Sequence, residues 1–151
     1  QPRLYADFKA EKLVGTTEPQ ADVEVEMQGF AYVVPDGIRA GKLLWEYDNT
    51  GTQWHMQFLI KPDADASMED VMAAMTTLMQ GGELSGPPPF EDVPDVGVPP
   101  LGPGERTWME VSLEPGTYIA VCPLPDLAAM ASGDQPMPHA AKGMERTLTV
   151  K

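Results

Sequence analysis

Residues 106–122, "RTWMEVSLEPGTYIAVC", contain two strand-like stretches on either side of a tight turn. In residues 106–113 apolar and polar residues alternate, which is the period-two pattern of a strand with one buried face. The Glu-Pro-Gly at 114–116 is typical of a turn, and the apolar stretch that follows ends at Cys122. The segment therefore predicts two strands, the second of which leads to the only cysteine of the chain.

Strand-like patterns recur along the chain and are separated by turn residues. They occupy residues 21–35, 42–49, 52–61 and 145–151. In the first of them Gly29 interrupts the alternation, which predicts a bulge or a bend. Six or seven short strands separated by turns predict an all-β fold, namely a β-sandwich with Greek-key connections.

One helix and one long loop interrupt this pattern. Residues 67–80, "SMEDVMAAMTTLMQ", have helical spacing, Ser67 and Asp70 resemble a capping box, and two glycines follow the last turn. Residues 83–104 contain seven prolines and four glycines, which predicts a long irregular loop. The expected architecture is an all-β, Greek-key β-sandwich with one inserted helix and a long Pro/Gly-rich loop.

Composition limits the possible functions. A chain of 151 residues that is 42% hydrophobic is long enough to bury a core, and we expect an extended arm over residues 1–21 and one domain over 22–151. Ten Lys and Arg against 23 Asp and Glu give a net charge of -13, which opposes binding to nucleic acid or to an anionic membrane. No apolar run has the length of a membrane-spanning helix. A single cysteine excludes an intramolecular disulfide, so Cys122 is a buried thiol, a reactive thiol or a metal ligand.

Three segments resemble the ligand-bearing parts of the cupredoxins, the small blue copper proteins such as plastocyanin and azurin. They are "NTGTQWH" (49–55), "EPGTYIAVC" (114–122) and "HAAKGMERTLTV" (139–150). The resemblance covers about residues 22–151, apart from two insertions at about 62–104 and 123–138. It implies a cupredoxin-like sandwich in which one histidine follows an Asn-x-Gly turn, while a cysteine, a histidine and a methionine come from the loop that joins the last two strands.

Carried over residue by residue, the resemblance implies one type 1 copper site with four ligands, His55, Cys122, His139 and Met144. Two imidazoles, a thiolate and a weak axial thioether hold copper in a geometry that suits both of its oxidation states. Family members usually have two to four residues between the cysteine and the second histidine, whereas sixteen separate them here. A hairpin excursion over residues 123–138 would begin and end at the same place and keep the ligands together, because the cost of closing a loop grows slowly with its length.

The resemblance implies an electron carrier rather than an enzyme. We expect it to be exported to the periplasm or the extracellular space, with its signal peptide already removed, and to cycle one copper ion between Cu(I) and Cu(II). Its partners would be redox proteins, met through the exposed edge of a histidine ligand. The alternative is a metal-free cupredoxin-like binding or structural subunit of an envelope or membrane-attached complex, which would make its contacts through the arm and the two insertions.

Two further possibilities come from the residues themselves. Four methionines form one face of the expected helix, Met68, Met72, Met75 and Met79. Thioethers bind Cu(I), so copper trafficking is a third option, although the same spacing is what an amphipathic helix needs to pack on a sheet. A Cys122–His139 nucleophile pair is formally available, but no phosphate-binding loop, nucleophile elbow or zinc-protease motif accompanies it.

Overall fold

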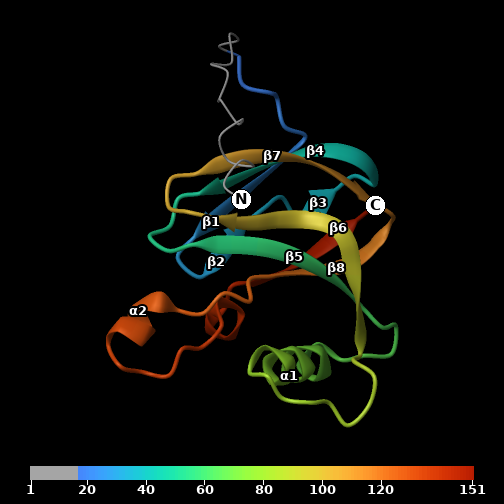
Figure 1. Cartoon of the computed structure of the whole chain (residues 1–151). Helices are drawn as coiled ribbons and strands as arrows, with labels where there is room; N and C mark the ends of the chain where they lie inside the picture. Colours follow the sequence, from blue (N-terminus) through green and yellow to red (C-terminus); the bar gives the residue numbers. More distant parts are fainter. Residues whose placement is uncertain (1–16) are drawn as a thin grey trace, which may run out of the picture.

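The fold consists of two β-sheets packed face to face, seen in a computed structural model that describes residues 17–151 (Figure 1). The strands of the first sheet are β1 (Val23–Gln28), β2 (Ala31–Val33), β4 (Gly41–Asn49) and β7 (Arg106–Leu113). Those of the second sheet are β3 (Gly37–Ile38), β5 (His55–Pro62), β6 (Phe90–Leu101), β8 (Gly116–Val121) and β9 (Glu145–Val150). The strand orders are β2-β1-β4-β7 and β3-β9-β8-β5-β6. The predicted β-sandwich is confirmed, and the turn at 114–116 carries the chain from one sheet to the other.

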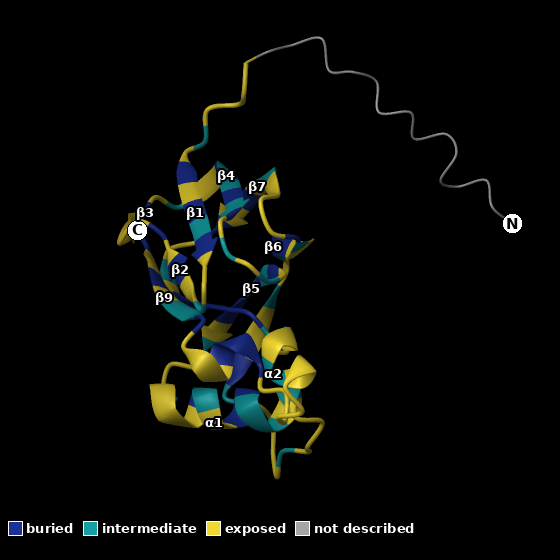
Figure 2. Cartoon of the chain, turned by 90° about the vertical axis from the view of Figure 1, so that its left-hand side faces the viewer, coloured by how far each residue is buried: buried dark blue, intermediate teal, exposed yellow. Residues whose placement is uncertain are grey.

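The core between the sheets is built from alternate residues of the strands. Val25 and Met27 of β1 are buried, and Trp45 and Tyr47 of β4 lie in the same layer. The second sheet contributes Leu59, Tyr118, Ala120, Cys122 and Leu148 to this core. In Figure 2 the colours of buried and of more exposed residues follow one another along β1, in agreement with its alternating burial. The period-two pattern of the sequence therefore corresponds to one buried face on each strand.

Helix α1 (Met68–Met79) covers the outer face of the second sheet. Its buried residues Val71 and Met75 pack in one cluster with Ile119 and Val121 of β8. Because Tyr118 and its alternate neighbours face the sandwich instead, β8 is buried on both faces, which explains its nearly continuous apolar sequence.

The predicted helix boundaries are confirmed. The Ser67 hydroxyl accepts a hydrogen bond from the Asp70 N–H at 3.1 Å, and Gly81, with a φ of 76°, follows the last turn. Of the four methionines on the helix face, Met75 is buried, while Met72 and Met79 are partly buried against the same cluster. Most of this stripe therefore serves packing against the sheet.

The prediction of an irregular loop over residues 83–104 is wrong for residues 90–101, which form β6. This strand lies at the edge of its sheet, where a proline does not interrupt a ladder on both sides. Its pairing with β5 also contains two register shifts. At one of them Gly97 has a φ of 112°, and an added Cβ would lie 2.1 Å from the Gln57 carbonyl oxygen. The composition of β6 resembles that of a loop because an irregular edge strand also contains prolines and glycines.

Two short helical elements were not predicted, α2 (Leu127–Ala131) and the 3-10 turn η1 (His139–Lys142). The Asp126 carboxylate accepts hydrogen bonds from the first N–H groups of α2. Pro125 and Pro138 form an isolated β-bridge, so the 123–138 insertion leaves and re-enters the fold at one place. This is the hairpin excursion that the sequence analysis required.

The remaining expectations concern the chain ends and membranes. Residues 1–16 of the expected arm lie outside the described residues, and residues 17–21 contain no helix or strand. The bend expected at Gly29, which has a φ of 54°, is the turn between β1 and β2. Within residues 17–151, every helix is too short or too polar to span a bilayer.

Candidate metal centre

Three side chains with metal-binding atoms meet at one end of the sandwich. One ligand atom each from His55, Cys122 and His139 lie within 4.8 Å of one another, and all three residues are at most 1% exposed. The His139 Nδ1 lies 3.2 Å from the His55 Nδ1 and 3.5 Å from the Cys122 Sγ. Tetrahedral sites with bonds of about 2.0 to 2.3 Å place neighbouring ligand atoms roughly 3.2 to 3.8 Å apart. The two donor pairs that include the His139 Nδ1 therefore have the spacing of ligands that share one metal ion.

His55 is positioned by the turn that precedes it. Asn49, which is fully buried, accepts a hydrogen bond from the Gly51 N–H at 3.0 Å. Its amide nitrogen donates to the carbonyls of Gln53 and Leu101, both at 2.8 Å. A Cβ on Gly51 would lie only 2.8 Å from the His55 Nε2. The Asn-Thr-Gly sequence therefore both shapes the turn and leaves room for the imidazole.

Backbone hydrogen bonds bring Cys122 and His139 together across the insertion. The Cys122 N–H donates to the Met144 carbonyl at 3.2 Å, and the Ala140 N–H donates to the Cys122 carbonyl at 2.9 Å. The His139 N–H donates to the Leu124 carbonyl at 2.8 Å. Both ends of the insertion are thus bonded to each other, so its length does not separate the cysteine from the histidine.

Met144 lies beside these residues and is fully buried. Its N–H donates to the His139 carbonyl at 3.0 Å, after Gly143 has turned the chain with a φ of 104°. Its side chain belongs to the core cluster between the sheets. The structure thus brings together the donor atoms of three of the four predicted ligands and holds Met144 next to two of them through its backbone.

Burial sets the protonation of the cluster. Burial, with a smaller contribution from the nearby His139, lowers the pKa of His55 to about 4. Burial also lowers the pKa of His139. It raises the pKa of the Cys122 thiol, whereas backbone hydrogen bonds from Met56 and Leu124 act in the opposite direction. Neutral imidazoles are ready to bind a metal, and the thiol proton is the one that a metal would displace.

The far side of His139 is held by residues that the sequence analysis missed. The Gln53 Oε1 lies 3.4 Å from the His139 Nε2, and the Gln53 Nε2 donates to the Asp126 Oδ1 at 3.0 Å. Lys142 forms a salt bridge with the same carboxylate. The Phe30 ring approaches His139 edge-on, with ring centroids 5.1 Å apart. Of these, only Asp126 had a sequence signal, because it precedes an Ala-rich run as a helix N-cap.

The expectation that a histidine edge is exposed is wrong. His55 and His139 are both only 1% exposed. An apolar cavity of about 250 Å³ is lined by Trp54, which precedes His55 in the chain, and by Pro100, Leu124, Pro125 and Leu127. The surface at Trp54 is therefore apolar, whereas the two imidazoles are buried.

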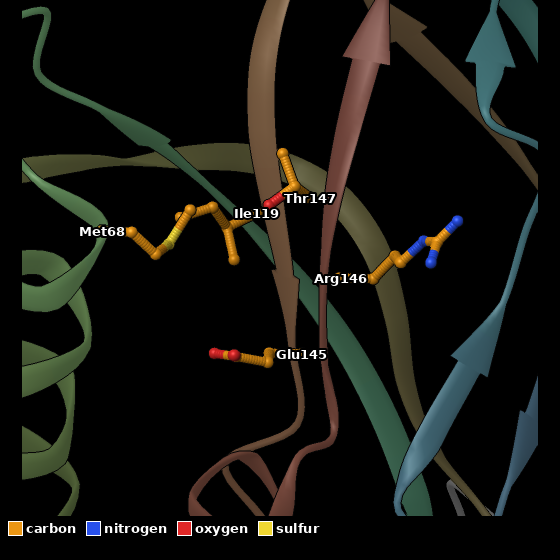
Figure 3. Close-up of a pocket in the computed structure, with 5 residues that line it drawn as sticks. All are labelled: Met68, Ile119, Glu145, Arg146 and Thr147. Atoms are coloured by element: carbon orange, nitrogen blue, oxygen red, sulfur yellow. The ribbon is translucent and has the colours of Figure 1, made fainter.

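A second cavity of about 250 Å³ lies between α1 and the outer face of the second sheet (Figure 3). It is lined by Met68, Ile119, Glu145, Arg146 and Thr147. In Figure 3 the Glu145 side chain points toward the helix, whereas Arg146 points away. Burial raises the pKa of Glu145. The lining contains neither histidine nor cysteine, so this cavity lacks the donor set of the cluster at His55.

Comparisons with known proteins give structural matches only. No protein-family model matches the chain, and no curated protein sequence matches it. An auracyanin from Roseiflexus castenholzii matches with a TM-score of 0.52 and 19% identity, over 85% of this chain and 94% of that one. Auracyanin A from Chloroflexus aurantiacus, described as a "blue" copper protein, matches with a TM-score of 0.53 and 15% identity, over 85% and 96%. Auracyanin B matches with a TM-score of 0.50 and 19% identity, over 89% and 93%.

Because these sequence identities are low, the structural matches show the fold of the chain and not its function. The cluster adds chemistry to the fold, because two imidazoles with one thiolate are the equatorial donor set of a type 1 copper site. The chain therefore has the cupredoxin fold, as its three sequence segments predicted, and carries a buried His-Cys-His cluster that fits a blue copper centre.

Proposed function

We propose that the protein is an exported, cupredoxin-like electron carrier with one type 1 copper site. His55, Cys122 and His139 would bind the ion, and Met144 would be the weak axial ligand. The observation that carries this proposal is the convergence of two imidazole nitrogens and one thiol sulfur in a buried cluster. Copper bound there supplies one-electron chemistry between Cu(I) and Cu(II).

The contribution of the polypeptide is to hold the ligands in place. The hydrogen bonds of Asn49 position the chain that leads to His55. Backbone bonds join Cys122, His139 and Met144 into one unit. Because the donor atoms are already clustered, a change of oxidation state would need little movement of the protein, which favours fast electron transfer.

The proposed partner is a redox protein, and the proposed location is the periplasm or the extracellular space. Because both imidazoles are covered, the partner would approach the apolar surface around Trp54 and Leu127, each 48% exposed. The net charge of -13 favours a basic partner. We assign this role to residues 22–151 acting as one domain.

The second candidate is a metal-free binding subunit of an envelope or membrane-attached complex. The exposed apolar residues of the 123–138 insertion favour it, namely Leu127, Met130 and Met137. These side chains would contact another subunit and lose their exposure. In that role the His-Cys-His cluster would only fill the core.

A copper titration of the purified protein separates the two candidates. We expect one bound copper per chain by elemental analysis and the intense visible absorption of a copper–thiolate bond. Cys122→Ser should lose this absorption, whereas Met130→Leu, which changes an exposed methionine, should keep it. Protein that binds no copper and shows no such absorption would contradict the electron-carrier proposal and favour the metal-free subunit.

A further inference from the structure

We infer that Gln53 is a positioning residue that keeps the proton of His139 on Nε2 and, through Asp126, holds the 123–138 insertion over that imidazole. The inference deepens the proposed function, because it concerns how one candidate ligand is presented to the metal. The inference rests on the proposed function only for the experiment on copper-loaded protein. The experiment on metal-free protein tests it without that function.

Two neighbours determine the orientation of the Gln53 amide. The Leu127 N–H lies 3.0 Å from the Oε1, and the Asp126 Oδ1 lies 3.0 Å from the Nε2. A backbone N–H only donates and a carboxylate, here paired with Lys142, only accepts. The amide oxygen, and not the nitrogen, must therefore face the His139 Nε2, from which it lies 3.4 Å away.

This orientation determines the tautomer of His139. Neutral imidazole carries one N–H, and the Gln53 Oε1 can accept it only if the proton is on Nε2. The Nδ1 is then left with its lone pair, and it faces the His55 Nδ1 and the Cys122 Sγ at 3.2 and 3.5 Å. The lone pair thus points at the place where a metal would bind.

The two imidazoles differ in this respect. The His55 Nε2 is buried and has no hydrogen-bond partner within the described part of the chain. Its orientation is set by the neighbouring turn, where an added Cβ on Gly51 would lie 2.8 Å from it. A side-chain acceptor is therefore provided for His139 and not for His55, and His55 can serve as an internal reference in an experiment.

The same contacts close a ring that covers His139. His139 and Lys142 both belong to η1, Asp126 lies in the insertion, and Gln53 lies in the loop before β5. The ring runs from the imidazole through the Gln53 amide and the Asp126 carboxylate to the Lys142 ammonium. Loss of the Gln53 side chain opens it at the imidazole, so we expect solvent to reach an Nε2 edge that belongs to a residue only 1% exposed.

Nitrogen-15 NMR of the metal-free full chain tests this directly. In the native protein we expect His139 to have its proton on Nε2 and to exchange it slowly with water. Gln53→Ala should give a mixture of tautomers and exchange roughly 2- to 10-fold faster, the factor expected for loss of one hydrogen bond. Asp126→Asn should shift His139 in the same direction by less, because Gln53 stays in place but loses its charged acceptor. Gln135→Ala, an exposed residue of the same insertion, should resemble the native protein.

The copper-loaded protein supplies a second readout. Loss of the Gln53 acceptor makes the His139 imidazole a poorer donor, which favours Cu(I), so Gln53→Ala should raise the reduction potential while Gln135→Ala leaves it unchanged. An unchanged His139 tautomer and exchange rate in both Gln53→Ala and Asp126→Asn would overturn the inference, whether or not copper binds. The expected tautomer change in a protein that binds no copper would support the inference and overturn the electron-carrier proposal instead.

Discussion

Replacement of Gly51 by alanine tests how the Asn-Thr-Gly turn positions His55. The added Cβ would lie 2.8 Å from the His55 Nε2 and 3.2 Å from the Asn49 Oδ1, whereas ordinary contacts begin at 3.4 Å. The imidazole must therefore move by about 0.6 Å, the difference between 3.4 and 2.8 Å, or the turn must open. His55 is only 1% exposed, and overpacking of a buried side chain costs about 1 to 3 kcal/mol.

Two measurements follow this substitution. Urea unfolding of the metal-free protein should show a loss of about 1 to 3 kcal/mol in the free energy of unfolding. Copper affinity, measured by competition with a chelator, should fall about 10- to 100-fold, as is usual when the residues that orient a metal ligand are changed.

Gly86→Ala is the matched control for this substitution. Gly86 is exposed, and an added Cβ there would have no neighbour within 4 Å. We therefore expect Gly86→Ala to resemble the native protein in both measurements. If Gly51→Ala unfolds and binds copper as Gly86→Ala does, the steric argument for the turn is refuted.

The remaining predictions concern acidity, the loop before β5 and the helix. Burial, with a smaller contribution from His139, lowers the pKa of His55 from 6.5 to about 4, so the unfolded state binds more protons between these values. This group alone should cost the metal-free protein about 3 kcal/mol of stability as the pH falls from 7 to 4. In urea unfolding, the stability of the His55→Gln variant should lack the part of the pH dependence that comes from His55. An equal pH dependence in the native protein and the variant would contradict this assignment. Asn49→Ala leaves the Gln53 and Leu101 carbonyls without their donor and should cost about 2 to 4 kcal/mol in chemical denaturation, whereas a cost near zero would show that water replaces the amide. Met75→Ala should cost about 2 to 5 kcal/mol but leave the copper absorption unchanged, because α1 packs on the outer face of the sheet; a shifted band would show coupling between the helix and the site.

Local features of the fold could be predicted because nearby residues determine them. The alternation in β1 and β7 follows from the strand period, and the helix after Ser67 follows from its capping residue and its spacing. The edge strand β6 escaped prediction, because the effect of its prolines depends on which neighbour pairs with them. A proline in the middle of a sheet would break a ladder, whereas the same residue at an edge is tolerated.

In the candidate metal centre, too, some features follow from the sequence and others from the tertiary structure. The sequence by itself determined which side chains carry donor atoms and that His55 follows a tight turn, since residue identity and short-range hydrogen bonds require no knowledge of the rest of the chain. Only the tertiary structure decided that His139 returns to Cys122 across the insertion, because this depends on backbone bonds such as that from the His139 N–H to the Leu124 carbonyl. It also decided that both imidazoles are covered. Closing a long loop costs little free energy, so its length does not reveal where it returns, and contacts between distant residues determine the outcome.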